Sequence, residues 1–177
     1  MSSDSAATSA PRIDLQHFRQ TCGKYATGVT IVTLFDSMGQ PHGLTANSFT
    51  SVSLDPPLVL VCVDNKAGIL EHFHAAEFMG VNILRESQKD LSNRFAGRGE
   101  DRFAGIKWQP GATGVPILPQ VIATFECAIV QRIPAGDHTI MLGEVHHITS
   151  RHGTPLLYFS SRYHILGTAE EGVDFLI

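Results

Sequence analysis

Apolar residues occur along the chain in short runs rather than long stripes, which predicts a protein built mainly from strands. Residues 29–35 form a β-branched and aromatic run, a turn cluster follows at 36–39, and a second extended segment passes through 43–45. These segments predict a hairpin. Further strands are predicted at 78–84, 121–133, 139–149 and 155–159, and the run at 58–63 is apolar on both faces, as in a buried central strand.

Helical spacing appears only over short stretches. Bulky residues recur at three- and four-residue steps between Ile13 and Tyr25, which predicts one amphipathic helix, and residues 67–76 and 87–95 predict two more. The Gly- and Pro-rich stretch at 105–119 predicts a long surface loop. Strands and helices do not alternate regularly, so the pattern predicts a mainly antiparallel barrel with helical additions.

Length and composition indicate one domain with short tails. The chain has 177 residues, of which 43% are hydrophobic and 17% charged, enough apolar surface for a core. Residues 1–12 are mostly Ser, Ala and Thr and predict a flexible tail, 13–167 the domain, and 168–177 a C-terminal tail. The apolar end of that tail would be oddly exposed on a monomer, so we expect it to pack on a partner copy.

Charge and cysteine usage narrow the functional classes. The net charge is −4 and no basic cluster appears, which argues against a nucleic-acid partner. No run is long enough for a signal peptide or a bilayer span, so no membrane role is expected. Three cysteines form no framework of disulfides, which favours a reducing, cytoplasmic location.

Motifs of several common enzyme classes are missing from the sequence. No GxGxxG, GxxxxGK[ST], GxSxG or HExxH occurs, which removes support for Rossmann, P-loop and hydrolase activities. The histidine pairs at 72 and 74 and at 146 and 147 have no third ligand at a recognisable spacing, so no metal site is predicted. Cys62 and Cys127 lie in apolar runs and are expected in the core.

The stretch from Gly43 to Pro57 is the most distinctive segment. Six small hydroxyl or amide side chains fall within nine positions, at residues 45–53. They offer neutral donors that suit a ligand rich in acceptors. From chemistry alone, a polar edge strand with its turn explains this segment equally well.

Four motifs in one order and spacing resemble the short-chain flavin reductase family. They are GLTANSFTSVSLDPPLVLVCVD, FMGVNIL followed by SQKDLSNRFAG, GDHTIMLGEV, and PLLYFSSRY, and the resemblance as a whole covers about residues 18–167. The resemblance implies an FMN-binding split β-barrel of antiparallel Greek-key type and a homodimer. It also implies an enzyme that uses NADH or NADPH to reduce FMN or FAD and supplies the reduced flavin to a separate monooxygenase.

The same resemblance implies the site residues. The flavin ring and ribityl chain would be lined by Gly43, Leu44, Thr45, Asn47 and Ser48, with Ser51 and Ser53 as further donors and Cys62, Val63 and Asp64 beside them. Lys66, Ala67, Arg94 and Phe95 match positions near the phosphate and the outer part of the cofactor, and Arg94 is the natural phosphate partner. His138 of the GDH element, with Arg162 and Tyr163, would lie beside the nicotinamide, and His138 would orient it.

Two departures from the family pattern bear on cofactor affinity. Ala67, Gly68 and Ile69 stand where many relatives have Ser-x-Thr, and Ser160 and Ser161 stand where many have Arg-Gly. Hydride transfer between two cofactors needs no protein acid or base, which fits the missing catalytic triad. An alternative is a flavin carrier or sensor without reductase activity. A third, an oxidase of a phosphorylated small molecule, has little support from the sparse Lys and Arg content.

Overall fold

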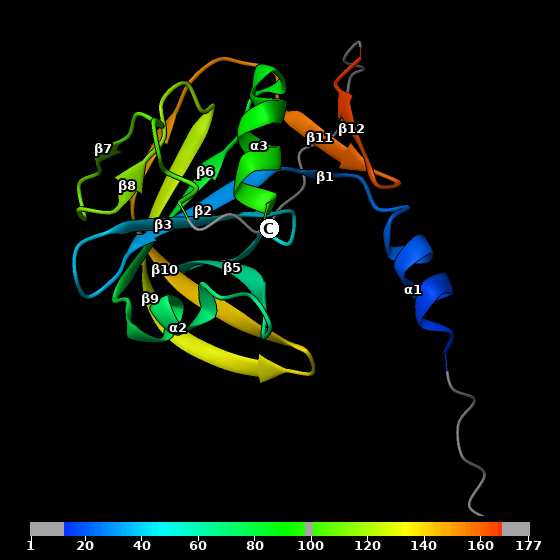
Figure 1. Ribbon diagram of the computed structural model, residues 1–177, viewed down its shortest axis with the longest axis horizontal. Helices are drawn as coiled ribbons and strands as arrows, with labels where there is room; N and C mark the ends of the chain where they lie inside the picture. Colours follow the sequence, from blue (N-terminus) through cyan, green and yellow to red (C-terminus); the bar gives the residue numbers. More distant parts are fainter. Residues whose placement is uncertain (1–12, 98–100, 168–177) are drawn as a thin grey trace, which may run out of the picture.

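The computed structural model describes residues 13–97 and 101–167, whose strands pair into three sheets (Figure 1). The largest has seven strands in the order β3-β2-β6-β9-β10-β5-β4, and it is joined by a three-stranded sheet, β1-β11-β12, and by the small pair β7-β8. All pairings between these strands of the described residues are antiparallel. The strands are β1 (Thr27–Gly28), β2 (Thr30–Phe35), β3 (Pro41–Ala46), β4 (Thr50–Leu54), β5 (Pro57–Asp64), β6 (Phe78–Ile83), β7 (Gln109–Pro110), β8 (Pro116–Ile117), β9 (Ala123–Ala135), β10 (His138–Ser150), β11 (Leu156–Phe159) and β12 (Arg162–Ile165). The prediction of a mainly β, antiparallel fold with short helices is confirmed.

The predicted first hairpin is present as β2 and β3. Its register pairs Phe35 with Pro41, and the turn between them contains Gly39 at a φ of 75°. A left-handed backbone of this kind costs glycine little, because glycine has no Cβ. The Asp36 side chain completes the turn by accepting the backbone N–H groups of Met38 and Gln40 at 2.9 and 2.8 Å.

The seven-stranded sheet curls so that its two ends approach each other. β3, one edge strand, contacts β5, which lies next to the other edge strand β4. Two hydrogen bonds link these ends: the Cys62 N–H donates to Ser48 Oγ at 2.9 Å, and Ser48 Oγ donates to the Cys62 carbonyl at 3.2 Å. The sheet therefore closes through one side chain rather than through a continuous ladder of backbone bonds.

Two hydrophobic clusters form the core. One fills the curled sheet and includes Val61, Phe73 and Met141. The other lies beside α3 and includes Ile31, Phe95 and Leu156. Full burial of side chains of this size contributes roughly 1.5–3 kcal/mol each, before the entropy of ordering is subtracted.

Two sequence expectations about burial are wrong. The run at 58–63, expected as a central strand buried on both faces, is β5, and its residues alternate between buried and half-buried. One face, with Val59, Val61 and Val63, packs into the core, and the other is only partly covered. The stretch at 105–119, expected as a surface loop, contains β7, β8 and the buried side chains of Val115, Ile117 and Leu118. β12 was not predicted at all.

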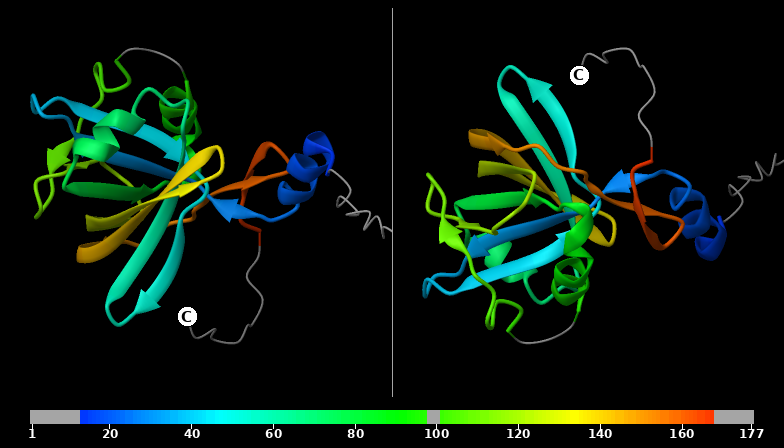
Figure 2. Two further views of the ribbon diagram at one scale, coloured as in Figure 1. Left: turned by 90° about the horizontal axis from the view of Figure 1, so that it is seen from below. Right: turned by 90° about the horizontal axis from the view of Figure 1, so that it is seen from above.

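The helices are short and differ in how they are packed. They are α1 (Leu15–Cys22), α2 (Leu70–Ala75), a 3₁₀ turn η1 (Glu86–Gln88) and α3 (Lys89–Ala96). Phe73 anchors α2 and Phe95 anchors α3 in the core. By contrast, α1 buries none of its residues and stands apart from the large sheet (Figures 1 and 2).

Some expectations fall outside the described residues. They are the tails predicted at 1–12 and 168–177, including the apolar end at 173–177. Within the part of the chain that the structure describes, no helix is long and apolar enough to span a bilayer.

Candidate functional site

The predicted cofactor residues at 43–53 divide between the two edge strands of the large sheet and the loop that joins them. The Thr45 hydroxyl is already used, because it donates to the Ser92 carbonyl of α3 at 2.7 Å. The loop joins the two edge strands, so its polar groups lie between the two ends of the sheet. In chain order the seven residues are Gly43, Leu44 and Thr45 on β3, Asn47 and Ser48 in the loop, and Ser51 and Ser53 on β4.

The end of β5 is placed beside the β9–β10 turn. His138 pairs with Asp64 across the ladder, and Asp64 accepts the backbone N–H of Lys66 at 2.8 Å. Asn65 joins the two turns: its amide donates to the Gly136 carbonyl at 3.3 Å, and its oxygen accepts the Thr139 hydroxyl at 2.8 Å. Residues predicted from two distant motifs thus lie together. Asn65 was not predicted, although its position between Asp64 and Lys66 made it a candidate.

His138 is held by its neighbour. Its Nδ1 lies 2.7 Å from Asp137 Oδ1, and its side chain is 43% exposed, so Nε2 is the ring nitrogen left for a ligand. The hydrogen bond to His138 lowers the pKa of the Asp137 carboxyl, which keeps that group ionised. The ring is therefore oriented before any ligand arrives.

The thiols of Cys62 and Cys127 are poor nucleophiles. Burial raises the pKa of Cys62, and burial together with Glu126 raises the pKa of Cys127 to about 12. Cys127 is buried in the core as predicted, whereas Cys62 is half-buried and belongs to neither core cluster, so the prediction is wrong for Cys62.

A pocket of about 1190 Å³ lies beside these turns. Four of the predicted residues line it: Gly43, Asp64, Lys66 and Ala67. Its wall also includes Arg102, which the sequence reasoning missed. Arg102 donates to the carbonyls of Gly43 and Gly97, each at 2.7 Å, and so carries a fixed positive charge. Partial burial lowers the pKa of Arg102, but a guanidinium remains charged at neutral pH.

Arg94 and Phe95 support the pocket instead of lining it. Arg94 Nε donates to the Arg102 carbonyl at 2.7 Å, and another of its nitrogens donates to the Ala104 carbonyl. Phe95 is fully buried and packs edge-on against Phe103, with ring centroids 5.0 Å apart. Arg102 is therefore better placed than Arg94 to meet an anion in the pocket.

Arg162 and Tyr163 lie on β12, in a different sheet from His138. The Tyr163 hydroxyl is 2.9 Å from Ser92 Oγ and donates to Asn93 Oδ1 at 3.0 Å. These bonds join β12 to α3. Within one chain the structure does not bring Arg162 and Tyr163 to the His138 turn.

Residues 22–167 match the family described as flavin reductase like domain. The chain belongs to this family.

Flavin reductase relatives and solved structures resemble the chain over most of its length. A probable flavin reductase of Rhizobium meliloti is 50% identical over 132 residues, which are 75% of this chain and 42% of that protein. The reductase subunit HsaB of a flavin-dependent monooxygenase from Rhodococcus jostii is 36% identical over 158 residues, 89% of this chain and 80% of that one. The chain spans about half the length of the two relatives that are 50% identical, 42% of one and 57% of the other.

A solved flavin reductase supports the predicted split barrel. The NADH:FAD oxidoreductase SgcE6 of Streptomyces globisporus, in complex with NAD and FAD fragments, superposes with a TM-score of 0.84 at 36% identity and covers 92% of this chain and 100% of that chain.

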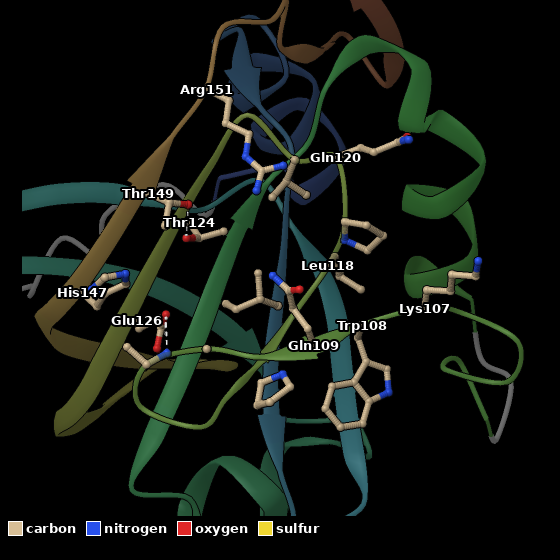
Figure 3. Close-up of a pocket in the computed structure, with 16 residues that line it drawn as sticks. Lys107, Trp108, Gln109, Leu118, Gln120, Thr124, Glu126, His147, Thr149 and Arg151 are labelled. Atoms are coloured by element: carbon tan, nitrogen blue, oxygen red, sulfur yellow. Dashed lines mark hydrogen bonds between the residues drawn. The ribbon is translucent and has the colours of Figure 1, made fainter.

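This flavin reductase family member has a second, smaller pocket of about 480 Å³ between the 107–121 segment and strands β9 and β10 (Figure 3). None of the predicted site residues lines it. Its buried Glu126 accepts the N–H groups of Ala112 and Thr113 at 3.0 and 2.6 Å and the Thr113 hydroxyl at 2.8 Å. This carboxylate is engaged in fixing the β7–β8 loop, and the predicted site residues lie at the larger pocket instead.

Proposed function

We propose that the protein is an NAD(P)H-dependent flavin reductase that reduces FMN or FAD and supplies the reduced flavin to a separate monooxygenase. The observation that carries the proposal is a large pocket lined by Gly43 of β3 and by Asp64, Lys66 and Ala67 at the end of β5. His138 pairs with Asp64, so the His138 turn lies next to this wall of the pocket. The names of similar proteins, which include a reductase subunit and an NADH:FAD oxidoreductase, support the same activity.

The residues around the pocket fit a flavin. The pocket volume of about 1190 Å³ exceeds the roughly 300–1,000 Å³ typical of small-molecule sites, so it has room for part of a nucleotide. Lys66 and Arg102, both in the pocket wall, supply positive charge for a phosphate. Thr45 and Ser48 already donate within the protein, so Asn47, Ser51 and Ser53 are the side chains of the 45–53 segment that we propose as neutral donors to the flavin. No hydroxyl comes from Ala67, Gly68 or Ile69. We therefore expect a modest affinity for flavin, which would let the bound flavin leave the site.

The protein's part in the reaction is to position two ring systems. A bound flavin supplies the hydride-accepting chemistry, so the chain need hold no acid or base at the reacting atoms. His138, fixed by Asp137 and exposed on the opposite side, would orient the nicotinamide. Asn65 would keep this histidine in register with the Asp64 turn. Arg162 and Tyr163 remain proposed nucleotide contacts, which in this arrangement would come from a second copy of the chain.

A homodimer is part of the proposal. α1 has eight residues and buries none of them, while Leu15 and Phe18 are 75% and 54% exposed. An isolated helix of this length is not stable in water, so an apolar partner surface is needed. We propose that a second copy supplies it. The free thiols at 22, 62 and 127 fit the reducing cytoplasm proposed as the location.

The deciding experiment is anaerobic stopped-flow absorbance. The protein is mixed with FMN or FAD and then with NADH or NADPH, and bleaching of the flavin band is followed. Fast bleaching with one pairing supports a reductase and identifies both of its cofactors. Flavin binding without bleaching would overturn the reductase proposal in favour of the carrier or sensor alternative.

His138→Ala tests the role of the histidine. We expect the variant to bind flavin as the wild type does but to lose at least tenfold in kcat/KM for NAD(P)H, because the nicotinamide is no longer oriented. His146→Ala, an exposed histidine further along β10, is the matched control and should keep full activity. An unchanged turnover in His138→Ala would show that this role is wrong.

A further inference from the structure

Three side chains of metal-ligand type converge at the rim of the large pocket. Asp36 begins the turn after β2, His42 lies on β3 and His72 on α2, and one ligand atom from each lies within 4.8 Å of the other two. His42 Nε2 is 3.0 Å from Asp36 Oδ2. The His42 and His72 rings stack with centroids 4.0 Å apart and planes inclined by 23°. Three separate elements therefore aim their ligand atoms at one point.

The carboxylate of this cluster is oriented in advance. Asp36 Oδ1 accepts two backbone N–H groups of its own turn, from Met38 and Gln40, which leaves Oδ2 facing His42. The Gln40 N–H and then the His42 ring hold the pKa of Asp36 below its usual range, so the group is ionised at neutral pH. Fixing the first ligand through a second set of hydrogen bonds is a general feature of metal sites in proteins.

The ligand types indicate which ions would fit. Two imidazoles and one carboxylate suit zinc and its neighbours cobalt and nickel, whereas magnesium and calcium prefer oxygen ligands throughout. Bonds of roughly 2.0–2.1 Å place tetrahedral ligand atoms about 3.4 Å apart. The ligand atoms lie within 4.8 Å of one another, so binding of an ion would require them to move closer and the two stacked imidazole rings to separate.

We propose that Asp36, His42 and His72 bind one divalent transition-metal ion of the zinc class at the rim of the pocket. All three residues are half-buried, and both histidines also line the pocket. Three protein ligands leave at least one coordination position, which here faces the pocket and is open to water or an anion. The ordinary alternative is a structural brace in which the Asp36–His42 pair fixes the turn and the histidines only stack.

The test is a titration of the full chain, freed of any affinity tag and of flavin, with Co²⁺ as the probe. Cobalt reports its coordination through visible absorption, and competition by Zn²⁺ gives the zinc affinity. We expect saturation at one ion per chain with the absorption of a site of low coordination number. The affinity should fall at least tenfold in His42→Asn and in His72→Asn. His74→Asn, two positions further along α2 and exposed, is the matched control and should bind within twofold of the wild type.

Two results would overturn the proposal: no saturable binding up to millimolar Co²⁺, or equal affinity in the wild type and His72→Asn. Should His72→Asn not fold, Asp36→Asn decides by the same criterion, because its amide oxygen can still accept the N–H groups of Met38 and Gln40. Since no flavin or nicotinamide is present, the outcome is independent of the proposed reductase activity.

Discussion

Gly43 of β3 couples the stability of the fold to the shape of the candidate site. A Cβ at this position would lie 2.8 Å from Phe95 Cε1, 3.0 Å from Phe95 Cδ1 and 3.2 Å from the Val32 carbonyl oxygen. Carbon atoms in favourable contact are about 3.5–4.0 Å apart, so Gly43→Ala requires the Phe95 ring to move. That ring is fully buried and packed edge-on against Phe103, so its movement would disturb this contact.

The expected cost follows from two opposing effects. Overpacking of a well-filled core costs about 1–3 kcal/mol. Replacing glycine by alanine stabilises the folded state by about 0.4–1 kcal/mol, because it lowers the conformational entropy of the unfolded chain. We therefore expect Gly43→Ala to lower the free energy of unfolding by about 1–2 kcal/mol, or the melting temperature by about 2–8 °C. Flavin affinity should fall as well, because the Gly43 carbonyl accepts the hydrogen bond that holds Arg102.

Urea titration of a double-mutant cycle measures this contact directly. In a Phe95→Leu background the ring edge is gone, so Gly43→Ala should cost little or nothing, giving a coupling energy of about 1–2 kcal/mol. Gly28→Ala on β1 is the matched control, because a Cβ there meets no atom within 4 Å. If the effects of Gly43→Ala and Phe95→Leu on the free energy of unfolding add to within about 0.5 kcal/mol, the predicted clash between them is refuted.

Three further predictions test the seam, which is the junction of the two sheet ends that Ser48 and Cys62 join, the proposed dimer contact of α1, and Asp36 of the proposed metal site. Ser48→Ala should lower the free energy of unfolding in urea by about 1–2 kcal/mol, since it leaves the Cys62 backbone groups unpaired, whereas Ser51→Ala on the exposed edge should change it little. Phe18→Glu should weaken dimerisation by about 100-fold in sedimentation experiments, and an unchanged Kd would remove α1 from the interface. The pKa of Asp36 is lowered from 3.8, so the stability it contributes is present above pH 3.8 and lost as the pH falls through the lower folded value. Asp36→Asn should therefore unfold with a weaker acid dependence below about pH 4, and an identical acid profile would contradict this.

The strands that could be predicted are those whose local signals agree. The β2–β3 hairpin combines a β-branched run with a turn that contains glycine, and the structure has both. β12 lacked such a signal. The turn before it is made by Ser160 and Ser161, whose φ angles of 47° and 61° are ones that glycine or asparagine normally adopts. A sequence-based reading looks for those residues and passes over two serines.

Burial in the 105–119 stretch depends on one distant residue. Glycine and proline correctly indicate irregular backbone there, but they carry no information about Glu126, which binds the loop from β9. The proposed metal site was hidden for a similar reason: Asp36 and His42 lie 36 and 30 residues before His72, and only the packing of α2 against the β2–β3 hairpin brings them together. Rules based on sequence spacing detect metal ligands that lie on one helix or strand, but not ligands that come from separate elements.

The position of the candidate site follows from the way the sheet closes. β3 and β4 are the edge strands of the seven-stranded sheet, so each has backbone N–H and C=O groups that no neighbouring strand uses. Ser48 ties the seam at one point, and the hydroxyl and amide groups of the 43–53 segment lie along it. A fully hydrogen-bonded barrel would use the backbone N–H and C=O groups of both edge strands, whereas an open seam leaves part of them unpaired. The incomplete closure of the sheet is therefore what places the candidate site beside β3 and the end of β5.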